Sequence, residues 1–164
     1  MDTPFYLESF QKIVDQLDLK LFDEKAIEVS VGIYLDSVFI KLYKKFWTSN
    51  PQEALTAESR IFFSVWISDA TIQKQKIMYN IHALKLRKLK GYRIESRKFA
   101  EIFRKDFKEY EQEWQNVSVN HGPLTLMEGS IKLDLENFQE EVLKLASNFL
   151  KIEYLIDQTL NRFK

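Results

Sequence analysis

Residues 26–44, which read AIEVSVGIYLDSVFIKLYK, decide the fold class. Two runs of alternating apolar side chains flank the short segment LDS at residues 35–37. The alternating positions are Ile27, Val29, Val31 and Ile33 in the first run, and Val38, Ile40 and Leu42 in the second. Successive side chains of a strand point to opposite faces, so this pattern is typical of strands that bury one face. The stretch therefore predicts a β-hairpin.

Three further segments alternate in the same way. RIFFSVWIS at residues 60–68 and IQKQKIMYNIHAL at residues 72–84 predict a third and a fourth strand, and SIKLD at residues 130–134 predicts a short last one. The polar stretch TSNPQEALTAES at residues 48–59 is the clearest loop. Because consecutive strands with short connections pair antiparallel, we expect a mainly antiparallel sheet of about five strands.

Apolar residues at a spacing of three and four predict three helices. The N-terminal helix covers residues 4–19 and follows Thr3-Pro4, a typical helix start. The central helix runs from an N-cap at Ser96 to about Trp114, and its buried stripe is Phe99, Phe103, Phe107, Tyr110 and Trp114. The long C-terminal helix follows a cap at Asp134, and its stripe runs from Leu135 to Ile156. Residues 1–164 are thus predicted to form a single α+β domain.

Composition limits the function classes. The 164 residues include no cysteine, which rules out disulfides and thiolate chemistry. The first residues lack the pattern of a secretory signal, and no apolar run is long enough to span a membrane, so we expect a cytoplasmic protein without a membrane partner. A Gly-rich phosphate loop, a His-Glu-x-x-His motif and a Gly-x-Ser-x-Gly elbow are all absent. The leading expectation is therefore a non-catalytic binding or protein-interaction module with no cofactor and no metal.

A basic strip gives the first alternative. Residues 85–93 read KLRKLKGYR, in which the bases Lys85, Arg87, Lys88, Lys90 and Arg93 alternate with leucines that could anchor the segment. The excess of bases continues to Lys98. Such a strip could bind nucleic acid or phosphate. The competing interpretation is a solvated surface, because Arg97, Arg104 and Lys108 lie opposite the aromatic stripe of the predicted helix.

The second face of the predicted sheet gives the second alternative, a small hydrolase or transferase. If one face of each strand is core, the other mixes aromatic and polar side chains, including Tyr43, Ser64, Trp66, Asn80 and His82. An apolar lining with a few convergent polar groups is typical of a ligand site, and His82 could carry a proton near neutral pH. The competing interpretation is that a helix covers this face and that its polar groups are satisfied inside. The other histidine, His121, is expected in a Gly-Pro turn without a catalytic role.

Overall fold

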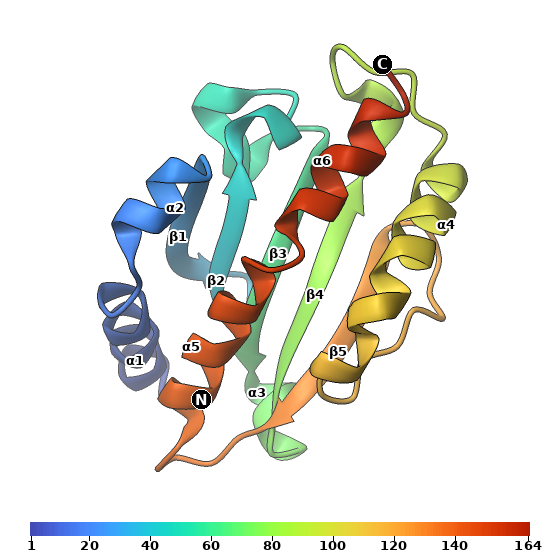
Figure 1. Cartoon of the computed structure of the whole chain (residues 1–164). Coiled ribbons are helices and arrows are strands. Elements are labelled where there is room, and N and C mark those ends of the chain that lie inside the picture. Colours follow the sequence, from blue (N-terminus) through green and yellow to red (C-terminus); the bar gives the residue numbers. More distant parts are fainter.

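The computed structural model describes residues 1–164 and has a layer of helices on one face of a five-stranded antiparallel sheet (Figure 1). The α+β fold class predicted from the sequence is confirmed. The strands are β1 (Ile27–Tyr34), β2 (Ser37–Lys44), β3 (Arg60–Ser68), β4 (Lys76–Leu84) and β5 (Thr125–Lys132). The α-helices are α1 (Thr3–Asp15), α2 (Leu19–Glu24), α3 (Asp69–Gln73), α4 (Ser96–Phe107), α5 (Phe138–Phe149) and α6 (Glu153–Asn161). Short 3-10 helices are η1 (Lys45–Trp47), η2 (Pro51–Thr56), η3 (Leu86–Lys88) and η4 (Lys108–Glu113).

The sheet is a meander, in which each strand pairs antiparallel with the strand before it in the sequence, in the order β1-β2-β3-β4-β5. The predicted hairpin is confirmed: β1 and β2 pair from Ile27 opposite Lys44 to Tyr34 opposite Ser37. β3 and β4 are connected by the one-turn α3, which begins with a capping box between Ser68 and Thr71. β5 begins at Thr125, before the start of the last strand predicted from alternation. The prediction missed this first part because a register irregularity, where Ile81 and His82 of β4 pair with Met127 and Thr125, interrupts the alternating pattern of β5.

The N-terminal and C-terminal helices are each divided in two. Asp2, not Thr3, caps α1 by accepting from the Phe5 backbone N–H at 3.2 Å. α1 ends at Asp15, and the Asp18 side chain caps α2 by accepting from Leu21 N–H at 3.2 Å. A carboxylate that can satisfy free N–H groups starts a new helix more readily than it continues an old one. The prediction of one helix over residues 4–19 is therefore wrong in its second half.

The C-terminal helix breaks between Phe149 and Glu153. There the Ile152 N–H bonds the Phe149 carbonyl at 3.0 Å, an i to i−3 bond that tightens the turn. Phe149 and Ile152 are both fully buried, so the break keeps both side chains in the core. At the other end the helix begins at Phe138. Asp134 belongs to the preceding turn, and Leu135 is 64% exposed, so both predictions at that start are wrong.

The central helix α4 buries the predicted phenylalanines Phe99, Phe103 and Phe107. Ser96 is its first residue and Glu95 occupies the N-cap position, so the predicted Ser96 cap is wrong. Arg104 does not project into solvent as predicted. Its guanidinium donates to four carbonyl oxygens, those of His121, Gly122, Thr125 and Leu126, at 2.8–3.0 Å. It therefore fixes the loop that leads into β5.

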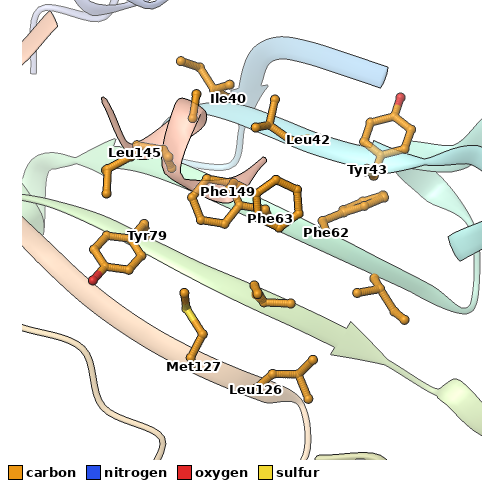
Figure 2. Close-up of a cluster of buried hydrophobic side chains, with 14 of the residues drawn as sticks. Ile40, Leu42, Tyr43, Phe62, Phe63, Tyr79, Leu126, Met127, Leu145 and Phe149 are labelled. Carbon is orange, nitrogen blue, oxygen red and sulfur yellow. The ribbon is translucent and has the colours of Figure 1, made fainter. Parts of the chain in front are cut away.

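The core lies between the sheet and the helices. α1, α4, α5 and α6 lie on the same face of the sheet in Figure 1, with α5 and α6 crossing its middle strands. Phe149 of α5 stacks on Phe63 of β3, with ring centroids 4.6 Å apart and planes 10° apart. Figure 2 shows this pair at the centre of the buried cluster. None of the helices is both long and apolar enough to cross a membrane.

The opposite face of the sheet carries the functional candidates, and we call it the open face. No α-helix lies over it in Figure 1. The interpretation that a helix covers it is therefore wrong.

Candidate ligand pocket on the open face of the sheet

Strand register arranges the open face in rows that run across the sheet. In the middle row, Lys41 of β2 lies opposite Ser64 of β3, which lies opposite Asn80 of β4. A neighbouring row pairs Phe39 with Trp66. On the other side Phe62 is opposite His82. Side chains directly opposite one another on adjacent strands are within contact distance. The register that sequence could not fix thus brings Ser64, Trp66, Asn80 and His82 together.

These rows surround a pocket of about 260 Å³. Its polar lining consists of Ser37, Lys41, Arg60, Ser64, Asn80 and His82. Its aromatic lining consists of Tyr34, Phe39, Phe62 and Trp66. Drug-sized ligands occupy sites of roughly 300–1,000 Å³, so this pocket suits a smaller molecule.

Two cations lie over one aromatic ring at the floor of the pocket. The Lys41 Nζ is 5.3 Å from the centre of the Phe62 ring, and the Arg60 Cζ is 5.8 Å from the same centre. Phe62 itself is 1% exposed, so the two side chains and their neighbours cover it. Lys41 also lies 4.5 Å from the centre of the Phe39 ring. Each such contact is worth about 0.5–2 kcal/mol and holds the cation near the ring.

Neither cation has a carboxylate partner. Lys41 and Arg60 take part in none of the chain's ion pairs. Arg60 Nη1 donates to the Ala57 carbonyl at 2.7 Å, but its buried Nε has no hydrogen-bond partner. Buried charged groups are normally paired, because leaving them unpaired costs free energy. The pocket therefore carries positive charge that an anion would neutralise.

Asn80 adds an unsatisfied acceptor. Its Nδ2 donates to Glu128 Oε1 of β5 at 3.4 Å. A carboxylate can only accept, so this contact identifies the remaining amide atom as Oδ1. Asn80 Oδ1 is buried and has no hydrogen-bond partner. A ligand with an N–H or O–H group could satisfy it.

His82 is half-buried beside the two cations. Burial lowers the pKa of His82, and the charges of Arg60 and Lys41 lower that pKa further. The imidazole is therefore neutral near pH 7, because its ordinary pKa is already about 6.5. A neutral ring has one donor and one acceptor nitrogen. His82 can thus exchange a proton with a group bound in the pocket.

Tyr43 is the one predicted open-face candidate that does not line this pocket. It is buried, its hydroxyl lies 3.1 Å from Ser30 Oγ, and its ring packs against Phe62 with centroids 4.8 Å apart. Figure 2 shows the Tyr43 and Phe62 rings side by side. On its other side Tyr43 borders a second hollow with residues of η2. Tyr43 therefore supports the pocket floor from beside it.

The basic strip lies apart from the pocket, on the connection between β4 and α4. Lys85, Arg87, Lys88, Lys90 and Arg93 are all exposed, and none forms an ion pair. Leu86 and Leu89 are buried, so the predicted anchoring by leucines is observed. The Arg93 N–H donates to the Phe163 carbonyl at 2.7 Å, which ties the strip to the C-terminal segment. Residues 109–164, which carry ten acids and five bases, leave these side chains exposed.

A larger hollow of about 540 Å³ lies between η4 and α5, but it has fewer unpaired polar groups that could bind a ligand. Its Lys144 is already paired with Glu141 at 3.3 Å. None of the chain's unsatisfied buried side-chain atoms lines it. No three His, Asp or Glu side chains gather in an arrangement that could hold a metal ion. The pocket on the open face is therefore the stronger candidate.

No protein family, curated protein or solved structure matches the chain. The assignment of function therefore rests on the geometry of the pocket.

Lys41 and Arg60 were not among the residues chosen from sequence for this site. Parity did place Lys41 on this face, and Arg60 could have been added to it, since Arg60 has the same parity along β3 as Ser64 and Trp66. Lys41 has the parity of Phe39 and Tyr43 on β2. The missing signal was that neither cation has an acidic partner, since Glu28, the acid opposite Tyr43, pairs with Lys45 instead.

Proposed function

We propose that the protein is a binding module whose open face takes a small ligand with a carboxylate or phosphate group on a flat apolar body. One observation carries the proposal: Lys41 and Arg60 share a pocket and have no acidic partner. A charge-assisted hydrogen bond from Arg60 Nε would satisfy that buried donor. The aromatic lining suits the apolar body, and Asn80 Oδ1 suits a hydrogen-bond donor on the ligand.

The test compares a carboxylate with a neutral ligand of the same shape. We expect 3-phenylpropionate to bind more tightly than 3-phenylpropanamide, with shifts in ¹H–¹⁵N NMR spectra confined to β2, β3 and β4. Replacing Arg60 by Gln should weaken carboxylate binding by roughly 10- to 100-fold, because hydrogen bonds to charged groups contribute about 1.5–3 kcal/mol. The matched control is Arg87→Gln, which removes an exposed arginine outside the pocket. Equal affinity for acid and amide would refute the proposal.

A second candidate function is nucleic-acid or phosphate binding by the basic strip. It is favoured by the exposed and unpaired bases of residues 85–93, which buried leucines hold in place. Replacing Arg87, Lys88 and Lys90 by Gln should lower affinity for single-stranded DNA and flatten its salt dependence by up to about three phosphate contacts. If the unaltered protein is not retained on heparin or single-stranded DNA at low salt, this candidate is refuted.

A further inference from the structure

Two lysines of the same strand occupy opposite electrostatic settings. Lys41 and Lys44 are an odd number of residues apart on β2, so they point to opposite faces of the sheet. On the helix face, Lys44 Nζ lies 2.6 Å from Glu153 Oε2 and 2.6 Å from Asp157 Oδ2. On the open face, Lys41 has aromatic rings and a second cation as neighbours, and no acid.

These settings move the two pKa values in opposite directions. Burial lowers the pKa of Lys41, and the charge of Arg60 lowers it further. Burial also lowers the pKa of Lys44, but hydrogen bonds to Asp157 and Glu153 outweigh burial and raise it. The rings around Lys41 favour its ammonium form, which opposes this lowering. A lysine desolvated beside another cation is the known setting for an amine nucleophile, because only the neutral amine reacts.

We propose that Lys41 captures α-keto acids as a reversible imine, with Arg60 holding the carboxylate next to the reacting carbonyl. The proposal rests on the anion pocket described above and adds a covalent bond to it. A keto acid fits because its carboxylate is bonded directly to its carbonyl carbon. The two cationic groups line the same pocket, with Lys41 Nζ 5.3 Å and Arg60 Cζ 5.8 Å from the centre of the Phe62 ring, so a ligand held there has both as neighbours.

The reaction needs no oxidant or further reactant. The neutral Lys41 Nζ attacks the carbonyl carbon and forms a C–N bond, which gives a carbinolamine. In the carbinolamine one hydrogen of the amine nitrogen has moved to the carbonyl oxygen. That oxygen leaves as water with one further proton, and a protonated C=N bond remains, which keeps the other hydrogen of the nitrogen. His82 lines the same pocket, and its neutral imidazole can take the proton that the Lys41 ammonium loses and return it to the leaving oxygen.

The experiment traps the imine on the whole protein. Phenylpyruvate is added with sodium cyanoborohydride near pH 7.5, and peptide mass spectrometry then locates the reduced adduct. We expect the adduct on Lys41 at low reagent, with Lys44 unmodified and the exposed Lys45 modified much more slowly. Lys41→Arg keeps the positive charge but cannot form an imine, so it should lose this adduct. Lys45 reacting as fast as Lys41 would overturn the proposal.

A ligand without a carbonyl separates the imine from the pocket. Phenyllactate has a hydroxyl where phenylpyruvate has its carbonyl, so it can bind without reacting. We expect it to bind the unaltered protein and to compete with phenylpyruvate, so that the yield of the reduced Lys41 adduct falls as phenyllactate is added. If phenyllactate binds but phenylpyruvate leaves no adduct on Lys41, the imine is overturned and the pocket stands. Failure of both ligands would overturn the pocket as well.

Discussion

The buried ion cluster around Lys44 gives a prediction whose magnitude follows from the structure. The Lys44 side chain is 7% exposed and lies 2.6 Å from carboxylates of Glu153 and Asp157, which are 6% and 30% exposed. Asp157 also accepts from Trp47 Nε1 at 2.7 Å. Replacing Lys44 by Met leaves two acids close together, with the half-exposed Lys25, 3.7 Å from Glu153 Oε1, as the remaining cation. Removing one partner of a buried pair costs about 3–5 kcal/mol, and the partial exposure of Asp157 favours the lower end.

Urea denaturation followed by circular dichroism measures this cost. We expect Lys44→Met to lower the free energy of unfolding by about 3 kcal/mol, a large part of the 5–15 kcal/mol typical of a domain. The matched control is the next residue: Lys45 is 63% exposed and 3.6 Å from Glu28, so Lys45→Met should cost roughly 0–1 kcal/mol. Adding Glu153→Met to Lys44→Met should recover part of the loss, because it removes a buried charge. A loss below about 1 kcal/mol for Lys44→Met would refute this reasoning.

Three other predictions concern the core, the sheet and the pocket. Phe149→Ala should lower the free energy of unfolding by about 3–5 kcal/mol in urea denaturation, and a change under about 1 kcal/mol would contradict its place in the core. Gly129→Ala should cost about 1–3 kcal/mol because a Cβ there would collide with the Tyr79 hydroxyl, whereas Gly122→Ala, with open space around it, should be nearly neutral in the same assay. Burial and neighbouring cations lower the pKa of His82, so the folded state binds its proton less readily than the unfolded chain, and stability should fall as pH drops below about 6.5. His82→Gln should flatten that decline in unfolding experiments between pH 7.5 and 5.5, and an unchanged slope would contradict the pKa shift.

Local patterns predicted the strands well. The alternation of residues 27–42 identified the hairpin because apolar residues recur at every second position of a strand that buries one face. Helix boundaries were harder, since apolar spacing continues across the breaks at residues 16–18 and 150–152. Those breaks depend on tertiary contacts: Asp18 caps a new helix, and Phe149 and Ile152 both reach the core.

The pocket was predictable only in part. Parity placed Asn80 and His82 on one face, but the partners across the sheet required the register, which a single sequence does not determine. The exposure of that face depended on where the helices pack, and all four helices that cover the core lie on the opposite face. Parity along β3 is enough to put Arg60 on this face, but its lack of an acidic partner and its unsatisfied Nε are seen only in the folded structure.

The meander order has a consequence for how the chain folds. Each strand pairs with its immediate predecessor, so the ladders among β1 to β4 close short connections and cost little chain entropy, whereas the β4–β5 ladder closes the longer segment of residues 85–124. Such sequence-local pairing lets the sheet assemble progressively, from β1 onward, as a chain is synthesised. The helices α5 and α6 are made last, yet Phe149 supplies the ring that stacks on Phe63. A ribosome-bound chain would therefore have a paired sheet with α1 and α4 on its apolar face, and the middle of that face would stay exposed until residues 138–161 emerge.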